Sequence, residues 1–416
     1  MIQRSQPNQL NQLNKLIQLI QPPEGYTMAP GPTNGNKLYF TKDHDMARRA
    51  ISDFIKKEIN PNVDQWEEDG IAPLKDIFKK MGDLGFLGIR YDPHYGGQGL
   101  DYWYDTVFLE ELGHIKALGL STAITVQTHM ATPAIAEFGN EDLKDTYLKA
   151  AIAGDMVGAI AVTEPGAGSD VAAIQTTAKK DGEDYVINGS KMYITNGTQA
   201  DFLTLLARTS DDPGYHSFSL FVVPTDVPGF TVSRKLDKLG IRISDTAELF
   251  FDNARVPADH LIGKVNEGFI YQMMQFQHER FSLLPFACTA AKDIIDMTLD
   301  HVRQRVVFGK PLIAKQVLRH RFADWLTEIE CLQQLIYHIV RMKEAGQDAT
   351  REISMGKLIA SQVLMKVADG CLQMYGGLGF MNEMLISRYY RDARGLAIGG
   401  GADEVMRDVI AKLEGY

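Results

Sequence analysis

The sequence predicts an α+β chain of several domains: an N-terminal helical domain, a central β-barrel domain and a C-terminal four-helix bundle. Apolar residues recur at helical spacing between residues 41 and 152, and again beyond residue 268. Between about residues 157 and 256, short β-branched and aromatic runs alternate with turn signals instead. Because 416 residues exceed what one compact core usually holds, two or three domains are expected.

The beginning of the chain differs in composition from the rest, and we expect a leader there. Residues 1–23 carry Arg4 and Lys15, no acidic residue and many Gln and Asn. A disordered polar tail and a mitochondrial transit peptide both fit this composition, and both stay open. The expected division is a leader at 1–37, a helical domain at 38–156, a β domain at 157–262 and a helical bundle at 263–416.

Helical periodicity divides the N-terminal domain into segments. Thr41 is a candidate N-cap for the first segment, and Pro61 ends it. Residues 93–99 form a glycine-rich loop between two of the helices. The expected helices cover residues 41–60, 73–87, 104–115, 121–138 and 143–152.

The middle and the end of the chain differ in the spacing of their apolar residues. Turn signals such as Asp212-Pro-Gly and Val227-Pro-Gly separate the short runs of the middle region, and such spacing is typical of a small barrel or sandwich. Between residues 318 and 339 apolar residues step by four and three, the pattern of a seam that packs against other helices. The expected strands include residues 202–207, 217–223, 230–232 and 247–251.

Composition excludes several classes of function. The net charge of −10 provides no basic excess for a nucleic-acid backbone, and no apolar run is long enough to span a bilayer. The ten histidines show no metal-binding spacing, so we expect no metal site. The three cysteines lie far apart in apolar patterns and are interpreted as buried hydrophobes, not as a disulfide framework.

The stretch from Ala161 to Asn196 is the strongest functional signal. Gly166 and Gly168 give a loop whose backbone N–H groups can point at an anion or a polar ring edge, and the nearby hydroxyls both donate and accept. The alternation from residue 185 to 195, with Gly189 at a bend, predicts a two-stranded hairpin that carries this loop. The hydroxyls belong to Thr163, Ser169 and Thr195.

A dinucleotide-binding fingerprint is the competing interpretation of these glycines. That fingerprint needs a strand, a Gly-rich turn and a helix inside a βαβ unit. Pro165 lies inside the loop here, and the segment after Asp170 is too short and charged for a crossover helix. The sequence therefore does not favour a Rossmann site.

Several motifs in a fixed order carry a family resemblance. The two runs at 161–170 and 185–196 are followed by 238–246, 305–316, 373–380 and 388–394. Together with the helix–β–helix order they resemble the acyl-CoA dehydrogenases over nearly the whole chain after the leader. Residues 277–281 and 398–406 look most like the citronellyl-CoA dehydrogenase branch, with an isovaleryl-type arrangement of the base.

The resemblance implies FAD, an acyl-CoA thioester substrate and transfer of electrons to an electron-transfer flavoprotein. It implies dehydrogenation of a fatty or branched-chain acyl-CoA to the trans-2-enoyl-CoA, as in fatty-acid oxidation. A second subunit is implied to complete the cofactor site, so the enzyme is expected to be at least a dimer and usually a tetramer. The implied FAD contacts are Thr163, Gly168, Ser169, Tyr193 and Thr195 and, from a neighbouring subunit, Arg305, Phe308, Gln316, Gln373, Gly376 and Gly377.

The catalytic base departs from the family's commonest pattern. Most members are expected to have a Glu where this chain has Gly400, whereas isovaleryl-type and long-chain members place it on a helix directly before an Arg. Glu279-Arg280 occupies that place, and its apolar neighbours would desolvate a carboxylate that would otherwise be interpreted as part of a solvated face. We therefore expect Glu279 to be the base. The expected substrate contacts are Ser169, Gln277, Arg280 and Gly400.

Lesser departures concern the walls of the site. Three glycines at 399–401 are expected to open volume for a branched acyl group, while the backbone N–H of Gly400 could donate to the thioester oxygen. Tyr193 replaces a common Trp and Ala402 a common Thr. His278, on another face of its helix, is expected to be structural.

Two other functions remain open on the sequence. One is an oxidase or monooxygenase of the same fold, and the other is an acyl-CoA-binding protein that has lost its base. The mitochondrial matrix is the expected compartment, with the cytoplasm as the alternative, and acyl length is not predicted.

Overall fold

The computed structural model describes residues 38–416, and the expected leader at 1–37 lies outside the described residues. We describe the compact unit from Lys42 to Tyr416. Among the described helices none is long and apolar enough to cross a membrane.

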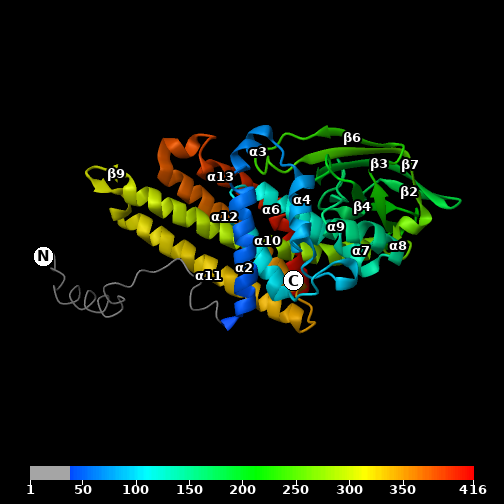
Figure 1. Cartoon of the computed structure of the whole chain (residues 1–416), viewed down its shortest axis with the longest axis horizontal. Coiled ribbons are helices and arrows are strands. Elements are labelled where there is room, and N and C mark those ends of the chain that lie inside the picture. The colour runs from blue at the N-terminus through cyan, green and yellow to red at the C-terminus, as the bar shows by residue number, and fades with distance from the viewer. Residues whose placement is uncertain (1–37) are drawn as a thin grey trace. The chain divides into compact units, whose positions relative to one another are not determined.

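Helices and π-helical turns fill the first part of this unit (Figure 1). The helix α5, capped by Asp101, is buried along Asp105–Leu112 and forms the centre of this region. The expected single helix at 121–138 is interrupted by a π-helical segment, η5, and restarts at Pro133. The elements are α2 (Lys42–Phe54), η2 (Ile55–Ile59), α3 (Val63–Asp69), α4 (Leu74–Asp83), the 3₁₀ helices η3 (Phe86–Gly88) and η4 (Pro93–Tyr95), α5 (Tyr102–Leu112), α6 (Leu118–Thr125), η5 (Val126–Ala131), α7 (Pro133–Phe138), α8 (Glu141–Leu143), η6 (Lys144–Leu148) and α9 (Lys149–Ile152).

The middle region is one mixed sheet of eight strands, and the β domain is thereby confirmed. The sheet runs in the order β6-β7-β3-β2-β4-β5-β8, with β1 parallel to β4. β6 and β8 end the order without pairing to each other, so the expected closed barrel is wrong. The strands are β1 (Gly158–Ala161), β2 (Thr177–Asp181), β3 (Asp184–Thr195), β4 (Phe202–Arg208), β5 (Phe218–Pro224), β6 (Phe230–Lys235), β7 (Thr246–Pro257) and β8 (Leu261–Ile262).

The expected hairpin at residues 185–195 is also wrong, because β3 is one continuous strand. Its register against β7 shifts between Ile187 and Gly189 and again between Lys191 and Ile194. Gly189 has φ +145°, and a Cβ there would lie 2.5 Å from Thr176 Oγ1. The glycine therefore permits a bulge and a close strand approach, not a chain reversal.

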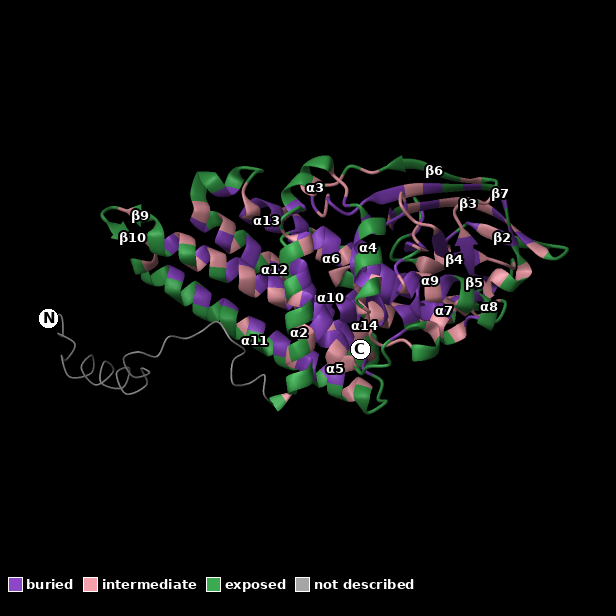
Figure 2. Ribbon diagram, viewed as in Figure 1, coloured by how far each residue is buried: buried purple, intermediate pink, exposed green. Residues whose placement is uncertain are grey.

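Strands β4 and β5 are buried on both faces, whereas β6 is exposed along most of its length (Figure 2). On one face β4 and β5 pack against helices α7 and α9, with Phe202 and Phe218 in that cluster. On the other face, side chains of six strands share a second cluster that includes Ile187 and Leu249. This second cluster is a single core to which most strands of the sheet contribute, as the strands of a barrel do. The alternation of apolar residues in the sequence is therefore the same as for a barrel.

The C-terminal part is helical, as predicted, and α10 is its central helix (Figure 1). α10 packs against α12 and also against α5, α7 and β5, so it passes from the bundle to the sheet. The apolar seam of residues 318–339 is buried in α11. The elements are α10 (Gly268–Gln304), β9 (Val306–Val307), β10 (Lys310–Pro311), α11 (Gln316–Glu344), α12 (Thr350–Tyr375), η11 (Gly376–Phe380), α13 (Leu385–Leu396) and α14 (Asp403–Leu413).

Candidate active site

A cavity of about 500 Å³ lies where α10 meets the sheet, helix α6, segment η5 and the loop between α13 and α14. The apolar wall includes Val126 and Met130 of η5 and Ile160 of β1. The residues predicted from sequence that the cavity brings together are Thr163, Gly168, Ser169, Tyr193, Thr195, Glu279, Arg280 and Gly400.

The glycine loop of this cavity is fixed to the sheet by a buried ion pair. Lys191 Nζ lies 2.9 Å from Glu164 Oε1 and also donates to the Val162 carbonyl at 2.8 Å. Burial lowers the pKa of Lys191 to about 8, while Glu164 opposes this shift. Glu164 also accepts from the backbone N–H groups of Gln175 and Thr176. The loop is thus held rigidly from behind, which leaves its other side to the cavity.

The wall next to this loop offers unused polar groups. Among the described residues, none forms a hydrogen bond with the hydroxyls of Thr163, Ser169 or Thr195. A Cβ at Gly166 or Gly168 would meet nothing within 4 Å. The polar edge of an isoalloxazine ring needs hydrogen-bonding groups beside it and room for the ring to approach the backbone. Free hydroxyls and glycines without neighbours provide both, so these residues fit an isoalloxazine.

An aromatic side chain completes that wall. Tyr193 has φ +62° and is 66% exposed although it lies in a strand. A positive φ in a non-glycine residue is strained, and such strain concentrates at functional sites. Asn196, also at positive φ, donates to the Ala123 carbonyl at 3.0 Å and holds the strand end in place. Tyr193 is therefore presented to the cavity by a backbone that is fixed around it.

Glu279 is the unpaired carboxylate of the cavity. It projects from α10 on the face that also carries Phe276 and Leu283. Burial raises the pKa of Glu279 to about 7, against the opposing charges of Arg280 and Lys357. No described residue donates a hydrogen bond to its carboxylate. An unpaired carboxylate that titrates near neutral pH is suited to accept a proton.

The glycine loop at 399–401 fits around this carboxylate. Gly400 has φ +67°, and a Cβ there would lie 3.4 Å from Glu279 Oε1 and 2.6 Å from Leu283 Cδ1. A side chain at Gly400 would therefore meet Leu283 and Glu279, and the volume expected for a branched substrate stays a prediction. The backbone N–H of Gly400 has no acceptor among the described residues, so it is free to donate to a ligand.

Two predicted substrate residues differ in their placement. Arg280 is buried, lines the cavity, and its Nε has no hydrogen-bond partner among the described residues. Gln277 does not line the cavity, and its Oε1 is likewise buried without a partner among those residues. Ala402 lies on the cavity wall, at the position where the sequence indicated the loss of a hydroxyl.

Asp392 of α13 is a wall residue that sequence reasoning missed. It accepts from the backbone N–H groups of Leu118 and Ile241 at 3.0 and 2.5 Å. Burial, with Glu67 nearby, raises the pKa of Asp392 to about 7. Ile241 has φ +48°, an outlier for a β-branched residue, so Asp392 holds a strained loop on the cavity wall. The motif at 388–394 was the available signal, but it assigned no role to this carboxylate.

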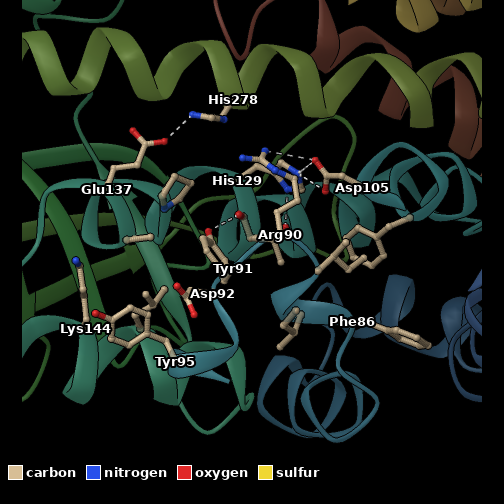
Figure 3. Close-up of a pocket in the computed structure, with 17 residues that line it drawn as sticks. Phe86, Arg90, Tyr91, Asp92, Tyr95, Asp105, His129, Glu137, Lys144 and His278 are labelled. Atoms are coloured by element: carbon tan, nitrogen blue, oxygen red, sulfur yellow. Dashed lines mark hydrogen bonds and ion pairs between the residues drawn. The ribbon is translucent and has the colours of Figure 1, made fainter. Parts of the chain in front are cut away.

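A second cavity of about 390 Å³ lies on the other side of η5 (Figure 3). His129 Nε2 lies 3.0 Å from Asp105 Oδ1, and Arg90 is 3.6 Å from the same carboxylate. His278 of α10 points into this cavity and pairs with Glu137 at 3.2 Å, as Figure 3 shows. His278 therefore lines a different cavity from Glu279. No sequence motif indicated this cluster, because its members come from separate segments.

The remaining predicted cofactor residues lie at the far end of α10. Arg305 caps that end and follows Glu279 by 26 residues, or about 39 Å of helix. Phe308, beside β9, is 97% exposed, and a Cβ at Gly376 or Gly377 would meet nothing within 4 Å. This distal set consists of Arg305, Phe308, Gln316, Gln373, Gly376 and Gly377.

Comparison with known proteins covers the described chain almost end to end. Three family models match in order: "Acyl-CoA dehydrogenase, N-terminal domain" over residues 41–155, "middle domain" over 159–254 and "C-terminal domain" over 266–414. An acyl-CoA dehydrogenase of Bacillus subtilis is 37% identical over 375 residues, 90% of this chain and 98% of that protein.

Two further relatives are similar to this chain over most of its length. The mitochondrial long-chain specific acyl-CoA dehydrogenase of Sus scrofa is 35% identical over 91% of this chain and 88% of its own length. The crystal structure of an acyl-CoA dehydrogenase from Geobacillus kaustophilus superposes with a TM-score of 0.87 at 40% identity, over 91% of this chain and 99% of that one.

Proposed function

The chain belongs to the acyl-CoA dehydrogenase family of FAD-dependent oxidoreductases, and from this premise we propose that Glu279 is the base that removes the α-proton of its acyl-CoA substrate. One observation carries the proposal. Glu279 is a cavity carboxylate that no described residue hydrogen-bonds and whose pKa burial raises to about 7. A base with that pKa is partly ionised at neutral pH and still basic enough to take a proton.

In the proposed reaction the substrate loses a proton and a hydride from adjacent carbons, which leaves the trans-2-enoyl thioester. Bound FAD supplies the acceptor for the hydride from the β-carbon. Glu279 takes the α-proton on its carboxylate, which becomes the neutral acid. The N–H of Gly400 donates to the thioester oxygen as negative charge develops there, which favours loss of the α-proton.

The structure supports the other predicted substrate contacts to different degrees. Arg280 is a buried cation with an unused donor on the cavity wall, which suits a negatively charged part of the substrate. The free hydroxyl of Ser169 supports its contact with substrate or cofactor. Gln277 is the weaker assignment because its side chain lies off the cavity wall.

A second copy of the chain is part of the proposal. Within the distal set, Arg305 lies about 39 Å along the helix from Glu279, too far to share a ligand with the cavity of the same chain. Its exposed aromatic ring and open glycines are suited to receive a flat cofactor from a neighbouring subunit. We therefore propose a dimer at least, and a homotetramer as its usual form.

The substrate, partner and compartment also remain proposals. We propose a fatty or branched-chain acyl-CoA, with an electron-transfer flavoprotein as the electron acceptor. The compartment is either the mitochondrial matrix or the cytoplasm, since relatives include a mitochondrial enzyme of Sus scrofa and an enzyme of Bacillus subtilis. The division at 38–156, 157–262 and 263–416 is supported by the changes from helix to strand and back.

Anaerobic bleaching of the flavin by a panel of straight and branched acyl-CoAs tests the function. We expect Glu279→Gln to bind these thioesters and to bleach at least about a thousandfold more slowly than the wild type. Bleaching at the wild-type rate would refute the assignment of the base. If no thioester bleaches the flavin of the wild type, the result would favour a binding protein. In a separate assay in air, rapid oxygen consumption during turnover would favour an oxidase.

A further inference from the structure

The glycine loop at 399–401 has no side chains of its own, and a buried lysine holds it from behind. The ammonium of Lys357, on α12, is fully buried and donates a hydrogen bond to the Gly401 carbonyl. The same ammonium lies 3.6 Å from Asp403 Oδ1, at the first residue of α14. No step of the proposed reaction uses this lysine.

The helix α12 anchors the loop at two adjacent points. Ser361, one turn after Lys357, donates to Asp403 Oδ1 at 2.7 Å. The backbone N–H of Asp403 in turn donates to the Ala397 carbonyl at 3.2 Å. These contacts fix where the loop leaves α13 and where it enters α14.

The other side of the loop touches the proposed base. A Cβ built at Gly400 would lie 3.4 Å from Glu279 Oε1, and one at Gly401 would lie 3.4 Å from Arg280 Nε. The loop is therefore a thin layer of backbone between α12 and α10. We propose that Lys357 is a positioning residue, which holds this layer against the Glu279 carboxylate and places a fixed positive charge behind it. The inference rests on the proposed role of Glu279.

Four helices contribute charged groups to the cavity wall or to the region directly behind the glycine loop. Arg280 of α10 and Lys357 of α12 are the cations, while Asp403 of α14 and Asp392 of α13 are the anions. Burial raises the pKa of Glu279, and the charges of Arg280 and Lys357 oppose that rise. Removal of the lysine charge therefore raises the pKa of the base further, and removal of the Asp403 charge does not.

Exchange of the α-protons of tert-butylacetyl-CoA in deuterated water tests the charge. This thioester has α-protons but no β-hydrogen, so exchange on the FAD-loaded enzyme reports the base and the loop without hydride transfer. In Lys357→Met we expect the pH midpoint of exchange to move upward by roughly one unit. In the matched control Asp403→Asn, which keeps an oxygen for Ser361, the midpoint stays or moves downward. An unchanged midpoint in Lys357→Met overturns the role of the charge.

Deuterium uptake of residues 396–406 in the FAD-loaded enzyme tests the positioning. We expect faster uptake in Lys357→Met than in the wild type, with little change in Asp403→Asn. Wild-type uptake in Lys357→Met overturns the positioning role. If Lys357→Met does not fold, Lys357→Gln also removes the charge, and the same two results decide.

One further variant separates this inference from the proposed function. Glu279→Gln is expected to abolish α-proton exchange while it keeps wild-type uptake over residues 396–406. Exchange at the wild-type rate in Glu279→Gln would refute the base assignment, and the uptake of Lys357→Met would then decide the positioning role alone.

Discussion

The two cavities on either side of η5 contain the same kinds of groups and differ in how those groups are paired. In the second cavity His129 contacts Asp105 at 3.0 Å and His278 contacts Glu137 at 3.2 Å (Figure 3). Although burial opposes it, the contact with His129 holds the pKa of Asp105 below its ordinary value. In the first cavity Glu279 has no such partner among the described residues, and burial raises its pKa to about 7.

Pairing with a basic group distinguishes a structural carboxylate from a reactive one. A carboxylate with a basic partner stays ionised and contributes to stability as long as the pair is intact. A carboxylate that is desolvated without a hydrogen-bond donor is costly to the folded state and is free to exchange a proton. Burial alone therefore does not identify the site, because both cavities contain buried carboxylates.

Removal of a paired carboxylate should show the largest effect on stability. We expect Asp105→Ala to lower the free energy of unfolding by roughly 3–5 kcal/mol, because it leaves His129 buried without its partner. Chemical denaturation measures this loss. The fraction that remains folded should bleach its flavin at the wild-type rate, and a loss of rate in that fraction would mean that the second cavity takes part in the reaction.

Removal of the unpaired carboxylate should have the opposite sign. We expect Glu279→Gln to raise the free energy of unfolding at pH 8 by up to about 3 kcal/mol. Water in the cavity reduces this value, because it solvates the ionised carboxylate of the wild type. The pKa of Glu279 is raised from 4.5 to about 7 by folding. The free energy of unfolding of the wild type therefore falls as the pH rises from 4.5 to about 7, whereas that of the variant does not. Below the unfolded pKa both states carry the proton, and the two proteins should unfold alike. A destabilised Glu279→Gln at pH 8 would place Glu279 with the structural carboxylates.

A smaller effect should come from the loop that fits around Glu279. We expect Gly400→Ala to cost about 1–2 kcal/mol and to slow bleaching, because φ is +67° there and the new Cβ would approach Leu283 Cδ1 to 2.6 Å. Gly399→Ala is the matched control, since its nearest neighbour is the Gly395 carbonyl oxygen at 3.6 Å. Thermal unfolding and bleaching rates measure both variants. Equal effects would show that the fit at Gly400 is unimportant.

The sequence predicted helices and the central motif well, because amphipathic periods and clustered glycines are local signals. It failed on the sheet, because the pairing of distant strands, which leaves β6 and β8 at the two ends of the order, is not a local signal. Gly189 gives the same local signal for a bulge as for a turn, and only the approach of Thr176 distinguishes them.

Within the site, local motifs again did better than distant contacts. Glu279 and the hydroxyl residues Thr163, Ser169 and Thr195 were predicted from motifs, and the structure brings them to one cavity. Asp392 was missed, since its partners Leu118 and Ile241 come from other parts of the chain. The close approach of Leu283 to Gly400 was also missed, because Leu283 belongs to α10 and is distant in sequence.

The pH dependence of anaerobic flavin bleaching tests the central claim most directly. With an acyl-CoA that the wild type accepts, the rate should rise as pH passes through about 7, because Glu279 must lose its proton to act as the base. Glu279→Gln should show a low rate with no rise in that range. A wild-type rate that is flat between about pH 6 and 8, or a Glu279→Gln profile that keeps the rise, would contradict the account.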